Sequence, residues 1–167
     1  TTGAQTYNNA VTLGANTALS SSGSGNINLA NTVSGGFSLA VNTSGDTTFG
    51  NTVSGLTSLT TDAGGTTNIN TTGITTSGAQ TYNDSVILGA NAVITSSASG
   101  AINFAGTVNG AQDLTINTAR LTTLGGIVGG STALNSITTD AAGTLTFSNN
   151  ITADNAITLN DAATLTG

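Results

Sequence analysis

The sequence lacks most of the side chains on which enzyme catalysis depends. Its 167 residues include no Cys, His, Met, Trp or Pro, and only 5% are charged. Without His and Cys there can be no Ser-His-Asp or Cys-His site, and no zinc site with the usual nitrogen and sulfur ligands. We therefore expect that the chain is not an enzyme and uses no cofactor.

Positive charge is nearly absent as well. Arg120, which we expect at the surface, is the single basic residue, and with seven Asp the net charge is −6. A surface that binds nucleic acid neutralises phosphates with several Lys or Arg, so nucleic acid is excluded as a partner. The sequence has no apolar run of about 18 residues that would insert into a membrane. With 37% hydrophobic residues the chain is nevertheless expected to fold.

A long internal repeat divides the chain into modules. Residues 1–35 return as residues 76–110, with 22 of 35 positions identical. The repeat defines a first module at 1–75, a second at 76–153 that includes three inserted residues, and the start of a third at 154–167. Such a fixed repeat is typical of rods in which each unit packs on its neighbours, so we expect one continuous solenoid.

A shorter period of about 20 residues, within the range typical of solenoid repeats, lies inside each module. LANTVSG at 29–35 matches FGNTVSG at 49–55 at five of seven positions. The same shift aligns one large apolar residue in each period, at Leu19, Leu39, Leu59, Ile94, Leu114 and Leu134. Because Ile94 follows Leu59 by less than two full periods, we interpret that interval as two shortened coils. A module then makes about four coils.

A second ladder places a large apolar residue four positions before a Val or Ile. Its large residues are Tyr7, Leu29, Phe49, Tyr82, Phe104, Leu124 and Phe147. Two residues after each lies a residue type that tolerates a left-handed backbone: Asn9, Asn31, Asn51, Asp84, Gly106, Gly126 and Asn149. We interpret these as corners between short strands, with Asn side chains that stack and hydrogen-bond along the axis.

The strands between these corners alternate apolar and polar residues, as in Leu114-Thr115-Ile116, and no window has helical periodicity. Short strands without helices fit either a parallel β-helix or an antiparallel sandwich or barrel. The equal spacing of the first ladder favours the β-helix, because residues one coil apart stack in a solenoid. The sequence therefore predicts an all-β fold, a right-handed parallel β-helix (β-solenoid) with about 20 residues per coil and eight to nine coils.

The GAQTYN-[ND]-x-V-x-LGAN segments and TTDAGGT at 60–66 resemble the repeats of large bacterial exoproteins related to filamentous haemagglutinin. The resemblance covers essentially the whole chain. It implies a right-handed parallel β-helix, an extracellular or surface location on a Gram-negative bacterium, and a role in adhesion, aggregation or biofilm. It transfers no binding residue to this sequence.

Asp62 and Asp140 are the only candidates for metal ligands that the sequence offers. They are equivalent, since TTDAGGT at 60–66 reappears as TTDAAGT at 138–144. Calcium requires about six to eight oxygen ligands, and the glycine-rich nonapeptide that supplies them in calcium β-rolls is missing. We therefore interpret both residues as parts of turns, and expect no metal site.

Three other functions fit single features of the sequence. Tyr7 and Tyr82 could stack on a sugar, which makes a carbohydrate-binding β-helix the main alternative, although both occupy a ladder position. Recurrent Thr pairs could order water on an ice-binding face, but Thr also suits strands because it is β-branched. A polysaccharide-cleaving β-helix needs clustered Asp, Lys, Arg or His, and this chain cannot assemble such a cluster.

The composition and the repeats together predict a structural, non-catalytic segment of an extracellular fibrous adhesin or matrix filament. Its role would be that of a stiff rod for surface attachment, cell aggregation or biofilm. Both ends continue the repeat and carry no protective Lys. We expect each end to pair with neighbouring repeats of the same long chain, or with copies of itself stacked head to tail, and consider cell-surface glycans as a further partner.

Overall fold

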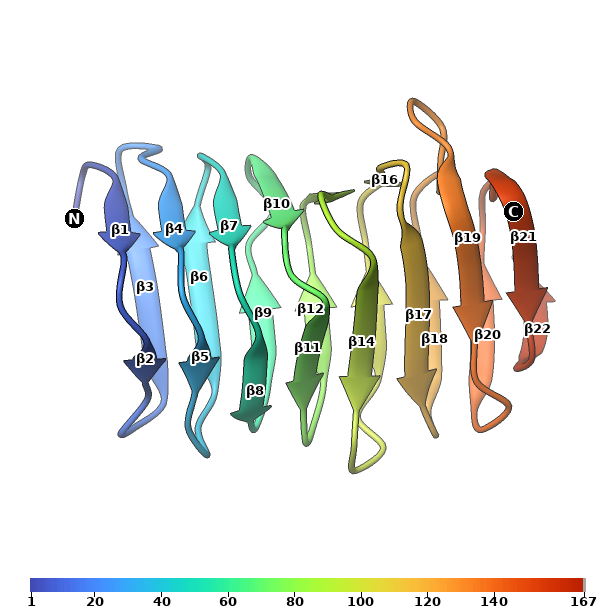
Figure 1. Ribbon diagram of the computed structural model, residues 1–167, viewed down its shortest axis with the longest axis horizontal. Helices are drawn as coiled ribbons and strands as arrows, with labels where there is room; N and C mark the ends of the chain where they lie inside the picture. Colours follow the sequence, from blue (N-terminus) through green and yellow to red (C-terminus); the bar gives the residue numbers. More distant parts are fainter. Residues whose placement is uncertain (167) are drawn as a thin grey trace.

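The protein is a parallel β-helix in its computed structural model, which describes residues 1–166. The rod has three sides, each formed by one parallel sheet, and the chain visits them in the same order in the first six coils (Figure 1). In the last two coils the isolated bridges of Val128 and Ile151 take the place of strands on the first side. Two of the sheets have eight strands, so the rod contains eight coils, in agreement with the predicted fold. The described residues include no helix that could span a membrane.

The sheets are called A, B and C in the order in which the chain meets them. Sheet A contains β1 (Gln5–Tyr7), β4 (Ile27–Leu29), β7 (Thr47–Phe49), β10 (Thr66–Ile69), β13 (Ser85–Leu88) and β16 (Val108–Asn109). Sheet B contains β2 (Val11–Thr12), β5 (Val33–Ser34), β8 (Val53–Leu56), β11 (Gly73–Thr76), β14 (Ala92–Ser96), β17 (Asp113–Thr118), β19 (Leu134–Thr139) and β21 (Ala153–Leu159). Sheet C contains β3 (Thr17–Ser21), β6 (Leu39–Thr43), β9 (Leu59–Thr61), β12 (Gln80–Tyr82), β15 (Ile102–Phe104), β18 (Leu121–Leu124), β20 (Thr144–Phe147) and β22 (Ala162–Leu165).

The core is a continuous apolar column enclosed by the three sheets. Successive residues of a strand point alternately inward and outward, as the burial of Asp113–Thr118 shows. The inward side chains stack on their partners in the next coil. The largest stack joins Tyr82 to Phe104, with ring centroids 4.9 Å apart and planes inclined by 10°. An aromatic pair of this kind stabilises a fold by about 0.5–1.5 kcal/mol beyond its burial.

The second ladder of the sequence is real, but it forms two separate columns. Tyr7, Leu29 and Phe49 are paired in sheet A. The other four ladder residues are paired in sheet C in the order Tyr82, Phe104, Leu124 and Phe147. The column of sheet A continues from Phe49 through Ile69 to Leu88 instead.

The first ladder is wrong in most of its pairings. Leu39 does pair with Leu59, but Leu19 pairs with Val41. In the second module the partner of Ile94 is Ile116, Leu114 pairs with Ala92 and Ile137, and Leu134 pairs with Ala153. The physical reason is the variable length of the corners. The step between paired residues is longer from Thr17 to Leu39 than from Leu39 to Leu59, and it is longer still from Leu114 to Ile137.

The seven expected corners all lie between strands, but their conformation differs from the prediction. Asn9, Asn31, Asn51, Asp84, Gly106, Gly126 and Asn149 all lack a positive φ. The Asn side chains do not form one axial ladder either. The Asn31 and Asn51 carboxamides accept hydrogen bonds of 2.8 and 2.7 Å from the N–H of the following Thr. This local bond turns the chain without a left-handed residue.

The repeated module lies on a different side of the rod each time it recurs. Gln5–Tyr7 lies in sheet A, whereas the identical Gln80–Tyr82 lies in sheet C. In the third module Asn160-Asp161 follows β21 as Asn83-Asp84 follows β12, and β21 lies in sheet B. Each recurrence therefore moves the module back by one side.

A module consequently spans less than the four coils expected from the sequence. Starting at Gln5, the chain completes three coils on sheet A, through Ile27, Thr47 and Thr67. It then crosses sheet B and reaches Gln80 on sheet C. The module makes three coils and two of the three sides of a fourth. The interval from Leu59 to Ile94 is one coil plus two sides, not two shortened coils.

Candidate functional site

The Tyr side chains considered for sugar binding belong to a buried hydrogen-bond network. Tyr82 is fully buried, and its hydroxyl donates a 2.7 Å hydrogen bond to Oε1 of Gln80. Nε2 of Gln80 donates a 2.8 Å bond to the carbonyl of Thr95. Burial raises the pKa of Tyr82 far above its ordinary value, so the phenol stays neutral. Tyr82 offers no ring face to a ligand in solution.

The first module repeats this network on another side of the rod. Tyr7 donates a 2.8 Å bond to Oε1 of Gln5, and Nε2 of Gln5 donates a 2.8 Å bond to the carbonyl of Ser20. Tyr7 is half-buried because it belongs to the first coil. The role of the Gln was not recognised from the sequence, although QTY occurs in both copies of the module.

Hydroxyl side chains at the ends of strands hydrogen-bond to glycines in two stacked corners, one that follows the strand and one in the neighbouring coil. Oγ of Ser21 donates a 2.9 Å bond to the carbonyl of Gly3 and accepts a 3.0 Å bond from the N–H of Gly25. Ser96 occupies the equivalent position of the second module and makes the same two bonds at 2.9 and 2.7 Å to Gly78 and Gly100. These contacts satisfy backbone groups that the corner would otherwise leave without a partner.

The Thr pairs do not build a flat outer array. In the seven pairs between residues 47 and 139 one member is buried: Thr47, Thr61, Thr67, Thr71, Thr76, Thr122 and Thr139. The outward members are spread over all sides, with Thr48 on sheet A, Thr75 on sheet B and Thr123 on sheet C. A single ice-binding face made of these pairs is therefore not present in the described residues.

Asp62 lies at a wide corner between β9 and β10, as its interpretation as a turn residue predicts. Its Oδ1 accepts a 2.9 Å bond from the N–H of Thr43 in the preceding coil. Asp84 lies at the narrow corner of the following coil and accepts hydroxyl bonds of 2.9 Å from Thr61 and 2.8 Å from Thr67. Burial raises the pKa of Asp84, the two Thr hydroxyls lower it, and the nearby Asp62 charge raises it again, with a net upward shift.

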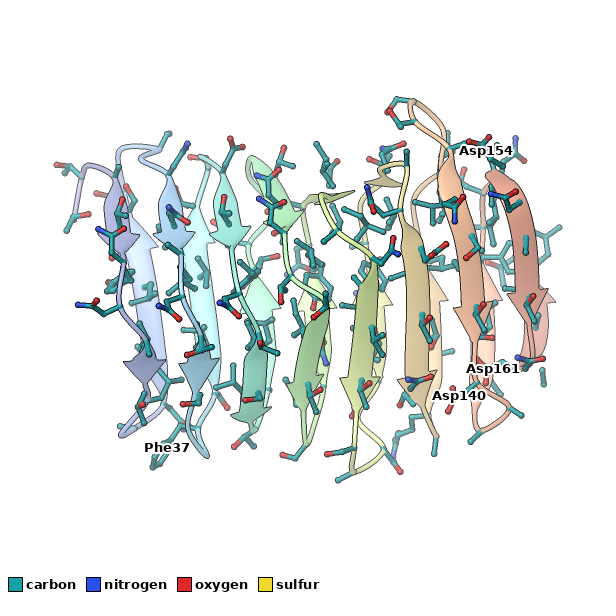
Figure 2. All side chains as sticks on the ribbon, in the orientation of Figure 1. Phe37, Asp140, Asp154 and Asp161 are labelled. Carbon is teal, nitrogen blue, oxygen red and sulfur yellow. The ribbon has the colours of Figure 1, made fainter. Side chains whose placement is uncertain are left out.

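The second module ends in an equivalent arrangement. Oδ1 of Asp140 accepts a 3.1 Å bond from the N–H of Thr118. Asp161 is buried in the next coil, and its backbone N–H approaches Oγ1 of Thr139 at 3.4 Å. Figure 2 shows Asp140 and Asp161 near the same edge of the rod, with Asp154 near the opposite edge. The pKa of Asp161 is raised, first by burial and further by the Asp140 charge.

The described part of the chain holds no group of three or more Asp, Glu, His or Cys placed for a metal ion. Each of the two arrangements contains two carboxylates, and two Thr hydroxyls contact the buried carboxylate of the first one. Arg120 is exposed, as expected from the sequence. Asp113 accepts its bonds from Asn135 and Ser136 on sheet B, away from Asp84, so these two carboxylates form no catalytic pair.

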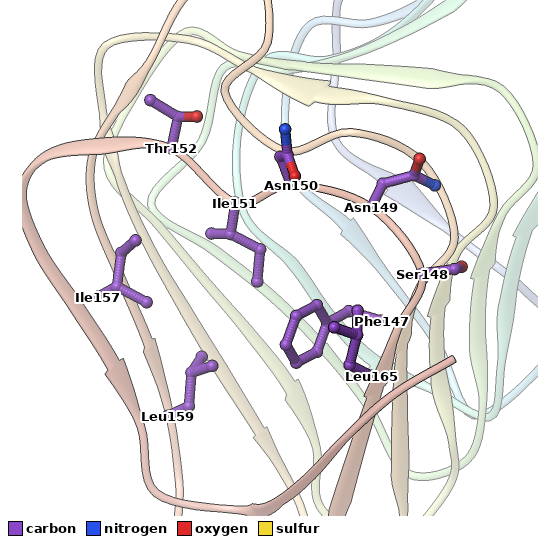
Figure 3. Close-up of a pocket in the computed structure, with 9 residues that line it drawn as sticks. All are labelled: Phe147, Ser148, Asn149, Asn150, Ile151, Thr152, Ile157, Leu159 and Leu165. Atoms are coloured by element: carbon purple, nitrogen blue, oxygen red, sulfur yellow. The ribbon is translucent and has the colours of Figure 1, made fainter. Parts of the chain in front are cut away.

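An open hollow lies at the C-terminal end of the rod. It measures about 670 Å³ and opens on the interior of the last coil, between Phe147 of sheet C and Ile157 and Leu159 of sheet B (Figure 3). Ile157 and Leu165 are large apolar residues that remain exposed there. The hollow is an open section of the core, not an enclosed pocket lined by convergent polar groups.

The comparisons with known proteins do not assign the chain to a family. No family model, no curated protein and no solved structure matches it. The likeness to haemagglutinin-related repeats therefore depends on the sequence motifs alone.

Proposed function

We propose that the chain is a non-catalytic segment of an extracellular fibrous adhesin or matrix filament. The observation that supports this proposal is the recurrence of one module on successive sides of an unbroken core, with the same Gln–Tyr hydrogen bonds in sheets A and C. A module that fits every side can be repeated along the axis without changing the cross-section of the rod. Length and stiffness are then the properties that repetition provides.

The ends of the rod support association along the axis. Among residues 1–166, the strands β21 and β22 each have a neighbour on only one side, and the apolar hollow beside them exposes core residues. A further coil would pair with these strands and cover the hollow. We infer that neighbouring repeats of the same long chain, or a second copy stacked head to tail, can supply such a coil.

Sugar binding is the alternative function, and the structure does not favour it. Tyr82 is buried, and the outer faces of the described sheets carry mainly Thr, Asn and Ser without a row of exposed aromatic rings. A glycan panel tests it, because saturable binding to the folded rod that is lost on mutation of outward Thr or Asn would support this alternative.

The test of the proposed function is to locate the natural polypeptide. Antibodies against the folded rod should label the surface of intact producing cells or fibres extending from them, and a protease added outside should remove the label. Labelling that appears only after the cells are opened would contradict the proposal. The mass of the denatured natural polypeptide then distinguishes one long chain from stacked short subunits.

A further inference from the structure

Two corners of the rod bring together carboxylates from adjacent coils. We call them the paired-Asp corners: the first contains Asp62 and Asp84, the second Asp140 and Asp161. Four of the seven Asp residues of the chain lie in these two places. The two corners are equivalent by sequence, since Asn-Asp follows Thr-Thr-Asp one coil later in both, although they lie at different edges of the rod.

Each paired-Asp corner contains a buried carboxylate that the protein leaves incompletely bonded. Asp84 is only 5% exposed, and its buried Oδ2 has no hydrogen-bond partner among the described residues. Asp161 is 6% exposed, and both of its carboxylate oxygens are buried without a partner in the same part of the chain. Burial of such an oxygen is costly unless a donor or a cation faces it.

No basic side chain is available to neutralise these corners. Arg120 is the only Lys or Arg of the chain, and it is exposed. At the first corner Asp62 already uses Oδ1 to accept the N–H of Thr43, and its negative charge acts on Asp84. A single proton on Asp84 would leave the Asp62 charge uncompensated, whereas a cation between the two coils would neutralise both carboxylates.

The side-chain groups that contact the buried carboxylate of the first corner are hydroxyls, whose oxygens can bind a cation. At the first corner the hydroxyls of Thr61 and Thr67 lie 2.9 and 2.8 Å from Oδ1 of Asp84. Hard divalent cations bind to sets of carboxylate, hydroxyl, carbonyl and water oxygens, and calcium tolerates irregular sets of about six to eight. We propose that each paired-Asp corner binds one divalent cation of the calcium class between the carboxylates of adjacent coils.

The two sites differ in one ligand, which predicts different affinities. In the alignment of TTDAGGTT with TTDAAGTL, Leu145 of the second module takes the place of Thr67. The second corner therefore has one hydroxyl oxygen fewer. We expect the first corner to bind more tightly, with both dissociation constants at the weak end typical of extracellular calcium sites, about 10⁻⁴–10⁻³ M.

The experiment is a calorimetric titration of the whole chain with calcium chloride. Magnesium chloride, and sodium chloride of equal ionic strength, serve as comparisons, and the thermal unfolding midpoint is measured in each salt. We expect two saturable calcium sites and a midpoint that rises with calcium. Asp84→Asn should leave one site, and Asp84→Asn with Asp161→Asn should leave none. Asp113→Asn should keep both, because Asp113 belongs to neither corner.

A second variant guards against misfolding of Asp84→Asn. Asp62→Asn keeps an oxygen that can accept the N–H of Thr43, so it should fold and still lose the first site. The proposal is overturned if the wild-type chain shows no saturable calcium effect, if magnesium binds equally well, or if the double variant retains both sites. It is also overturned if stability responds to pH and not to calcium, since a proton would then occupy the corners.

Discussion

Tyr7 and Tyr82 occupy the same position of the repeated module, yet they face the core from different sheets of the rod. Each donates its hydroxyl to the Gln two residues earlier, at 2.8 and 2.7 Å. The module therefore carries its own local structure of strand, corner and strand, and does not depend on the side on which it lies. This interchangeability of the three sides is the main property of the fold.

Removal of the Tyr82 hydroxyl should destabilise the rod measurably. In Tyr82→Phe, Oε1 of the buried Gln80 loses its donor, and an unsatisfied buried group costs about 1–3 kcal/mol. Tyr7→Phe is the matched control, and a smaller loss is expected because Tyr7 is half-buried and water can replace the donor. Urea unfolding of both variants measures the difference. Equal losses would contradict the role of burial.

Tyr82 should also govern the stability of the rod in alkali. Burial raises its pKa in the folded chain, so the folded state favours the neutral phenol. Below the ordinary tyrosine pKa of about 10 this group leaves stability unchanged. As the pH rises above that value, ionisation stabilises the unfolded chain and folding stability falls. Phenolate absorbance should show that one tyrosine ionises only when the chain unfolds. In Tyr82→Phe that tyrosine is missing, so no tyrosine ionisation should accompany unfolding.

Two adjacent glycines should respond differently to the same substitution. Gly35 has a φ of +121°, and a Cβ on it would lie 2.5 Å from the carbonyl oxygen of Leu13. We expect Gly35→Ala to lose about 1–3 kcal/mol of stability. A Cβ on Gly36 meets no atom within 4 Å, so Gly36→Ala should change stability by less than about 0.5 kcal/mol. Thermal unfolding measures both effects. A Gly35→Ala variant as stable as the wild-type chain would contradict the positive φ and the close approach of the Leu13 carbonyl at this corner.

The absence of Cys makes the register of the coils directly testable. Thr81 and Asn103 are paired across β12 and β15, and both side chains point outward. Thr81→Cys with Asn103→Cys should form a disulfide on mild oxidation, because paired Cα atoms of neighbouring strands lie within the range that a disulfide spans. Thr81→Cys with Ala101→Cys, the pairing that a constant shift of 20 implies, should not. The reverse result would reject this register.

Most of the fold could be predicted from sequence because strand alternation and stacking are local properties. The columns Tyr7–Leu29–Phe49 and Tyr82–Phe104 follow from one short pattern repeated along the chain. Parallel pairing follows because consecutive hairpins would not place equivalent residues of successive repeats beside each other. The number of coils follows from the length of the chain and the period.

The pairing register of the strands, and the change of side from one module to the next, could not be predicted from that pattern. Leu19 was assigned to Leu39 because corners were assumed to have constant length, whereas the corner between β3 and β4 is longer than the one between β6 and β7. The change of side could nevertheless have been inferred, because a module whose length is not a multiple of the coil length cannot begin on the same side each time it recurs. The paired-Asp corners were missed for a related reason, since Asp62 meets Asp84 only when the register is known.

The length of the rod as modules are added is the decisive measurement. A chain extended by one further module should be about 18 Å longer by small-angle X-ray scattering, from three coils and two sides at about 4.8 Å per coil. Its cross-sectional radius should stay unchanged. A longest dimension that does not grow, or a cross-section that widens with the added mass, would contradict the proposal that the module exists to build a stiff rod.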